Sequence, residues 1–310
     1  MMVSMGAFNL NDGFMKLSFE QLGVSQALFM RGCVATVILL AAALYTGAWR
    51  YVPARGERGP LALRAVGEIF ATGSFMVALA HMPIANATAV LQAAPLAVTM
   101  AAATILGERV GWRRWSAIGV GFIGMLIILR PGTAGFDVYA IAAVIAVVFM
   151  TVRDLGTRAM SRRTPTVFAS LMSAILITVG AAVVIPFEGW RPVDGLHLGY
   201  MLAAGTFVFA AYFTNVLAVR TGEISAVAPF RYTVLLFALG VGYLFFGDVP
   251  DRVMLLGAAI VVAAGLYTLW REQQMGHRFA AAGSARPFGG GVHGRIDGKP
   301  TSRGSTRKEF

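Results

Sequence analysis

The sequence predicts an all-α membrane protein with ten transmembrane helices, arranged as two inverted five-helix repeats. Three observations lead to this prediction. The 310 residues are 57% hydrophobic and 13% charged, with a mean hydropathy of +0.69, whereas soluble domains carry roughly 25% charged residues. Apolar runs long enough to cross a bilayer recur along the whole chain. Motifs of the first half return in the second half at a nearly constant offset.

The apolar runs define the expected spans in order. A run of about 20 residues at about 1.5 Å per residue crosses a hydrocarbon core about 30 Å thick. The expected spans cover residues 2–19, 24–46, 61–80, 84–106, 113–129, 136–157, 166–186, 197–219, 224–246 and 253–270.

The fourth and fifth spans show the pattern most clearly. Two apolar runs, 84–106 and 116–129, are separated by a hinge that contains three arginines and two tryptophans. Arginine is enriched at the cytoplasmic edge of a membrane and tryptophan at both edges. This stretch therefore predicts a membrane hairpin whose hinge is cytoplasmic.

The distribution of Lys and Arg predicts the topology. Segments 50–64, 109–114 and 158–163, residue 220 and the tail from Arg271 carry four, three, three, one and eight of them. The alternate loops, 20–23, 81–83, 130–135, 187–196 and 247–252, carry none, none, one, one and one. Because cytoplasmic loops are the basic ones, we expect both termini in the cytoplasm. We expect the protein itself in the inner membrane of a bacterial cell.

The net charge of +11 is thus a topology signal, and we expect a lipid bilayer and no nucleic acid as partner. The tail 271–310 holds eight Lys/Arg against three Asp/Glu. It is rich in glycine and poor in aromatic residues, so we expect it to be disordered.

Three sequence patterns repeat between the halves. Asn11-Asp12-x-x-x-Lys16 is echoed by Arg153-Asp154-x-x-x-Arg158, Pro83–Ala87 by Glu223–Val227, and Glu108 by Asp248, at offsets of 142, 140 and 140 residues. Five spans per half would insert the second copy upside down, an arrangement found in many secondary transporters. We expect repeats at 1–131 and 132–270, followed by the tail.

Ionisable residues within spans are the first candidates for a substrate site, because charge at membrane depth is costly. Asp12 and Lys16 lie four residues apart, so they share one helix face and can either pair with each other or line a polar pathway. Arg31 and Arg231 each lie about two turns into a span. Either guanidinium suits the carboxylate of a substrate or a carboxylate of the protein.

Two prolines are expected to break helices. Pro95 and Pro229 lie inside the fourth and ninth spans, where a break frees backbone carbonyls or bends the helix. Gln92 and Tyr232 lie near these breaks, so we include both among the expected substrate-binding residues.

The sequence contains no motif for metal binding, ATP binding or catalysis. The one cysteine, Cys33, and four scattered histidines predict neither a disulfide nor a metal site. No Walker-type loop, G-x-S-x-G elbow or H-E-x-x-H pair occurs. We therefore expect no cofactor, no catalytic residues and no ATP-driven transport.

The chain resembles the EamA-type family of the drug/metabolite transporter superfamily over about residues 6–270. The resemblance lies in Asn11-Asp12-x-x-x-Lys16, the lone Arg31, Ala78–Thr88, Pro95-Leu96, Gly107-Glu108-Arg109, Trp115, Gly121–Met125 and Arg130-Pro131. Within the family, Asn11-Asp12, Arg31 and Ala228–Tyr232 look most similar to the S-adenosylmethionine uptake carriers of intracellular bacteria. The acid of the second half departs from the family pattern, because Asp248 is followed by Val-Pro.

This resemblance implies two inverted EamA-like repeats that move small organic metabolites by alternating access. It suggests S-adenosylmethionine or another amino-acid-like zwitterion as substrate, with Asp12 and either Arg31 or Arg231 as counter-charges. One alternative is an exporter of amino acids or drugs, since residues do not encode direction. An alternative of another class is a membrane-embedded enzyme.

Overall fold

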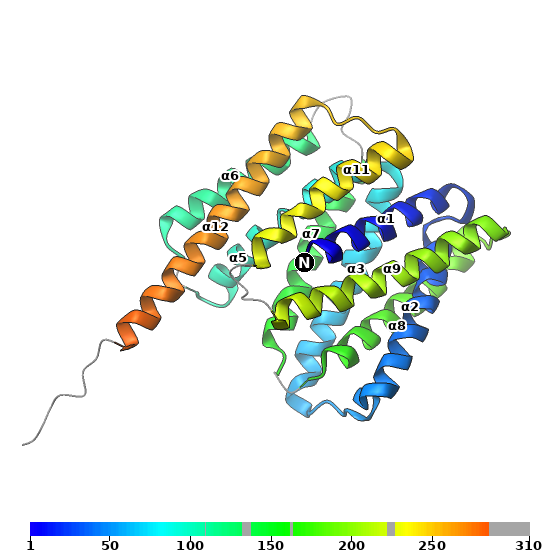
Figure 1. Cartoon of the computed structure of the whole chain (residues 1–310), viewed down its shortest axis with the longest axis horizontal. Coiled ribbons are helices and arrows are strands. Elements are labelled where there is room, and N and C mark those ends of the chain that lie inside the picture. Colours follow the sequence, from blue (N-terminus) through cyan, green and yellow to red (C-terminus); the bar gives the residue numbers. More distant parts are fainter. Residues whose placement is uncertain (109, 132–137, 162–163, 222–226, 285–310) are drawn as a thin grey trace, which may run out of the picture. The chain divides into compact units, whose positions relative to one another are not determined.

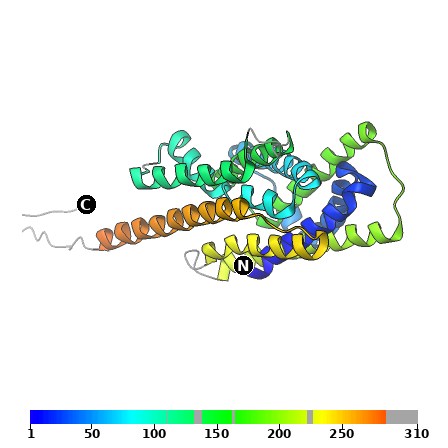
Figure 2. The same cartoon turned by 90° about the horizontal axis from the view of Figure 1, so that it is seen from above.

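The computed structural model describes residues 1–108, 110–131, 138–161, 164–221 and 227–284. Every regular element in these ranges is a helix (Figures 1 and 2). They are α1 (Met2–Leu22), α2 (Val24–Thr46), η1 (Ala48–Arg50), α3 (Arg55–His81), α4 (Ile84–Leu91), α5 (Ala94–Ile105), α6 (Trp112–Leu129), α7 (Val138–Ala159), α8 (Thr166–Glu188), α9 (Gly195–Thr221), η2 (Ala228–Thr233), α11 (Val234–Phe246) and α12 (Arg252–Ser284). Residues Met1–Gln273 form one compact unit, and a second begins at Gln274.

Nine helical segments of the described chain are long and apolar enough to cross a membrane. They run from Val24–Thr46 to Arg252–Arg271 and coincide with the second to tenth expected spans. The first helix, α1, has 21 residues and is thus long enough, but its Asn, Asp and Lys side chains make it too polar to be counted with these nine segments. The chain is a multi-pass membrane protein.

The fourth span is interrupted where Pro95 lies one turn downstream. Pro95 has no N–H for the carbonyl of Leu91, and its ring crowds that carbonyl. The helix therefore ends at Leu91 and starts again at Ala94, and Gln92 and Ala93 donate to carbonyls only three residues back. Pro229 lies in the 3₁₀-helix η2, directly before α11.

Helices from the two halves of the chain pack in pairs. α3 packs against α7, α1 against α9 and α2 against α8, as Figure 1 shows for α1 with α9 and α2 with α8. Glycines allow the closest approach between α3 and α7. A Cβ on Gly67 would lie 2.5 Å from the amide nitrogen of Arg153, and one on Gly156 would lie 2.6 Å from that of Arg64.

Some expectations differ from the structure or lie outside its described part. Helix α12 continues to Ser284, past the expected end of the tenth span, so the first part of the segment 271–310 is helical. Residues 285–310, whose disorder we expected, are outside the described residues. So are Arg109 and residues 223–226, which contain most of the Glu223–Val227 echo.

Candidate substrate-binding cavity

A cavity of about 390 Å³ that carries several charged side chains lies among helices of both halves. Its walls come from α1, α2, α3 and α4 of the first half and from α7, α8, α9, η2 and α11 of the second. A volume of roughly 300–1,000 Å³ is typical of small-molecule sites. The cavity is therefore large enough for a small organic metabolite.

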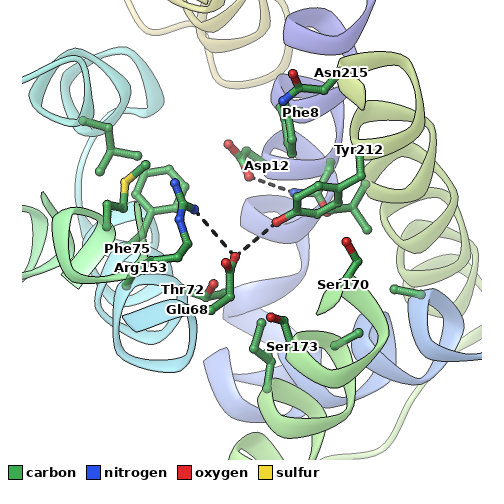
Figure 3. A pocket seen from close by; sticks show the side chains of 18 of the residues that line it. Phe8, Asp12, Glu68, Thr72, Phe75, Arg153, Ser170, Ser173, Tyr212 and Asn215 are labelled. Carbon is green, nitrogen blue, oxygen red and sulfur yellow. Dashed lines mark hydrogen bonds and ion pairs between the residues drawn. The ribbon is translucent and has the colours of Figure 1, made fainter. Parts of the chain in front are cut away.

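One wall of the cavity carries Asp12 and Arg31, linked by the side chain of Asn11. Arg31 Nη1 donates to Asn11 Oδ1 at 3.4 Å, and Asn11 Nδ2 donates to Asp12 Oδ1 at 2.8 Å. Asp12 extends toward the centre of the view in Figure 3. The amide thus separates the two charges while holding both side chains.

Both charges lack an ion-pair partner in the described part of the chain. Neither Asp12 nor Arg31 has an opposite charge within 4.0 Å there. Arg31 is only 7% exposed, and its buried Nε has no hydrogen-bond acceptor among these residues. A buried charge without a partner is costly, so Arg31 is suited to accept an anionic group from a ligand.

A second polar cluster surrounds Glu68, which is 4% exposed on α3. Tyr212 Oη of α9 donates to Glu68 Oε1 at 3.2 Å, and Arg153 Nη1 of α7 lies 3.7 Å from the same oxygen. Figure 3 shows Glu68 between these two side chains. On its own helix, Arg64 Nη2 lies 3.8 Å from Glu68 Oε2. The cluster thus joins α3 to two helices of the second half.

Glycine packing positions this cluster. Gly67 and Gly156 bring the backbones of α3 and α7 into contact at the level of Arg153 and Arg64. Side chains next to such a contact can meet only because the two helices approach so closely. The neighbour of Gly67 in sequence, Glu68, therefore reaches Arg153.

Glu68 and Tyr212 line the cavity but are not among the residues expected from the sequence. Glu68 is the only acidic residue in the expected third span, 61–80, and an acid at membrane depth is a recognised signal of a functional site. Tyr212 gives no comparable signal, because tyrosine is common in membrane helices.

Four of the six expected substrate-binding residues line the cavity. Asp12 and Arg31 lie on the wall described above. Gln92 lines the cavity from the C-terminal end of α4, and Arg231 lines it from η2. Arg231 is exposed, so it marks the rim rather than the interior.

Lys16 and Tyr232 lie elsewhere. Lys16 Nζ donates to the carbonyl of Leu79 at 3.0 Å and to that of Met82, and lies over the ring of Phe246. It caps the C-terminal end of α3 instead of pairing with Asp12, because its long stem reaches the free carbonyls of the last turn. Tyr232 is 7% exposed and packs against Gly265 of α12, where a Cβ would lie 1.8 Å from its hydroxyl.

The second-half echo of the Asp12 and Lys16 motif, Arg153-Asp154-x-x-x-Arg158, also lacks a contact between its acid and the base four residues on. Asp154 Oδ1 accepts from Nε of its neighbour Arg153 at 2.8 Å. Arg158 Nη1 lies 3.4 Å from Glu108 Oε1 outside the cavity. Arg153 is thus the basic partner of both Glu68 and Asp154.

A bundle of apolar helices around a cavity that carries charged side chains is typical of membrane transport proteins. The model of the EamA-like transporter family matches residues 2–130 and 138–270. The chain belongs to this family, which confirms the identification made from its motifs.

Curated relatives carry different substrates in their names. The S-adenosylmethionine uptake transporter of Rickettsia prowazekii is 24% identical over 275 residues, covering 88% of this chain and 92% of that protein. The riboflavin transporter of Rhizobium johnstonii is 29% identical over 203 residues, 65% of this chain and 67% of that one. The pseudopaline exporter CntI of Pseudomonas aeruginosa is 25% identical over 260 residues, 83% and 90% of the two chains.

A solved structure described only as "Crystal structure of protein" has the same fold. It is 18% identical in sequence and superposes with a TM-score of 0.59 over 86% of this chain and 95% of that chain. The relatives are named as transporters, which supports a transporter of small molecules and not an enzyme.

Proposed function

We propose that this protein is a secondary transporter that moves a dipolar organic metabolite across a bacterial inner membrane by alternating access. The proposed substrate is S-adenosylmethionine or another amino-acid-like zwitterion. Family membership supports the transport function, and the uptake transporter of Rickettsia prowazekii supports the substrate. One observation carries the proposal: Asp12 and Arg31, which have no ion-pair partner among the described residues, lie on one wall of the cavity.

The proposed contacts follow from these charges. The carboxylate of Asp12 binds the cationic group of the substrate, and the guanidinium of Arg31 binds its carboxylate with charge-assisted hydrogen bonds. Gln92 contributes hydrogen bonds, and Arg231 attracts the carboxylate at the rim. Because Lys16 and Tyr232 lie away from the cavity, we assign them structural roles, Lys16 at the C-terminal end of α3 and Tyr232 in packing against Gly265 of α12.

The proposed topology has ten spans, with α1 as the first and both termini in the cytoplasm. The excess of Lys and Arg in alternate loops supports this orientation. Helix pairing supports two inverted repeats at 1–131 and 132–270. In such repeats α1 corresponds to α7, and α3 corresponds to α9. Exchange of the two halves therefore turns the contact between α3 and α7 into a contact between α9 and α1, and both contacts are present.

An exporter is the second candidate within the same class. The similarity to the pseudopaline exporter of Pseudomonas aeruginosa favours it. A carrier without ATP drive runs in the direction that the gradients impose, so one cavity serves both uptake and export.

Counterflow in proteoliposomes tests the proposal. Vesicles preloaded with unlabelled S-adenosylmethionine should accumulate the labelled compound transiently, and empty liposomes should not. Folded protein that accumulates riboflavin but not S-adenosylmethionine would overturn the proposed substrate. Protein that accumulates neither these compounds nor any of a panel of amino acids and drugs would overturn the transport function.

A further inference from the structure

The cavity carries nearly balanced charges. Four arginines line it, Arg31, Arg64, Arg153 and Arg231, against three acids, Asp12, Glu68 and Asp154. Glu68 is the only one of these acids that is buried. In surroundings of low dielectric, a buried charge acts on its neighbours far more strongly than one in water.

Glu68 faces its two arginines without forming hydrogen bonds to them. The N–O distances of 3.7 Å to Arg153 and 3.8 Å to Arg64 exceed the usual range of about 2.7–3.2 Å. The hydroxyl of Tyr212 is its hydrogen-bond donor instead. Glu68 therefore compensates the charge of the arginines but leaves their donors available.

The donors of the two arginines are only partly used. Arg64 Nη1 donates to Thr157 Oγ1 at 2.7 Å, while its buried Nε has no acceptor among the described residues. Arg153 directs Nε to Asp154 at 2.8 Å. Without the carboxylate of Glu68, two guanidiniums beside the cavity would form a site for an anion.

We propose that Glu68 determines the charge selectivity of the cavity: its carboxylate excludes organic anions from the cluster of Arg64 and Arg153. The substrate class is thereby restricted to dipolar or cationic metabolites, and the carboxylate of a dipolar substrate is left to Arg31. Specificity arises here from a repulsive element built against the wrong ligand. The inference rests on the proposed function in one respect, since it takes the cavity as the substrate site.

The test measures the thermal stability of purified protein in detergent, with sulfate as the probe. Glu68→Gln should gain a saturable rise in Tm on addition of sodium sulfate, because a ligand that binds only the folded state stabilises it. The wild type should show a smaller rise, which combines the general effect of sulfate on proteins with sulfate bound at Arg31. Equal sulfate responses of Glu68→Gln and the wild type would overturn the proposal.

Glu108→Gln is the matched control. It removes the same charge from a carboxylate beside an arginine, at 3.4 Å from Arg158, but outside the cavity. It should respond to sulfate as the wild type does. A response of Glu108→Gln as large as that of Glu68→Gln would overturn the proposal, because the effect would then not belong to the cavity.

Glu68→Asp keeps the test decisive if Glu68→Gln does not fold. Aspartate retains the negative charge, so this variant should respond to sulfate as the wild type does, and a larger response would overturn the proposal. Failure of this proposal is distinct from failure of the transport function. The sulfate response reports the charge of the cavity without any transport, whereas counterflow by the wild type reports transport without any substitution.

Discussion

The hydroxyl of Tyr212 on α9 donates a hydrogen bond of 3.2 Å to Glu68 on α3, joining residues 144 positions apart in the sequence. The ring of Tyr212 lies edge-on to Phe8 of α1, with centroids 5.3 Å apart. One side chain therefore connects two helices of the first half with a helix of the second half, beside the cavity. Such a connection must rearrange if the two halves move relative to one another.

Removal of this hydroxyl should destabilise the protein. In Tyr212→Phe the buried carboxylate of Glu68 loses its hydrogen-bond donor, and a hydrogen bond to a charged group contributes about 1.5–3 kcal/mol. A lower Tm in detergent is the expected result. Tyr45→Phe is the control, since Tyr45 is 94% exposed and its hydroxyl can be lost without effect. An unchanged Tm for Tyr212→Phe would show that the bond contributes nothing.

Gly67→Ala should separate α3 from α7. The new Cβ would lie 2.5 Å from the amide nitrogen of Arg153, and backbone cannot move aside as a flexible side chain can. Overpacking of this kind costs about 1–3 kcal/mol, and we expect both a lower Tm and weaker transport. Gly73→Ala on the same helix is the control, because its Cβ would meet nothing within 4 Å. Equal effects of the two substitutions would contradict the proposed helix contact.

Lys16→Met should lower stability without changing substrate affinity. Methionine keeps the apolar stem but cannot donate to the carbonyls of Leu79 and Met82, so the end of α3 loses its cap. We expect a lower Tm and an unchanged KM in the surviving folded protein. A raised KM at unchanged Tm would instead return Lys16 to the substrate site, where the sequence had placed it.

Asp12→Asn should weaken the binding of S-adenosylmethionine about tenfold or more, because asparagine keeps the shape but removes the charge that faces the cationic group. Equilibrium binding to purified protein measures the loss. S-adenosylhomocysteine, which lacks the sulfonium charge, is the comparison ligand. A loss shared by both ligands assigns Asp12 to the ammonium group, and a loss confined to S-adenosylmethionine assigns it to the sulfonium. Unchanged binding of both would exclude Asp12 from the site.

Hydropathy predicts the apolar helices of this fold. The second to tenth expected spans coincide with apolar helices of the structure, because a bilayer requires long uninterrupted runs and the chain satisfies this requirement locally. Asp12 and Arg31 were candidates for the same reason, since a charge at membrane depth is exceptional, and both line the cavity.

The remainder of the site depends on packing that hydropathy does not record. Glu68 is buried because Gly67 and Gly156 bring α3 and α7 together, and no local pattern shows which helices meet. The contact of Lys16 with the end of α3 was not predictable, because a long flexible side chain can reach a neighbouring helix. Spacing along one helix describes only intrahelical neighbours.

We propose that Arg31 binds the carboxylate of the substrate inside the cavity. Counterflow of labelled S-adenosylmethionine by Arg31→Gln tests it most directly, with Arg50→Gln as a control, since Arg50 is exposed in η1 and lies beside Trp49. We expect Arg31→Gln to lose counterflow about tenfold or more while remaining folded, and Arg50→Gln to retain it. Counterflow at the wild-type level by folded Arg31→Gln would contradict this role of Arg31.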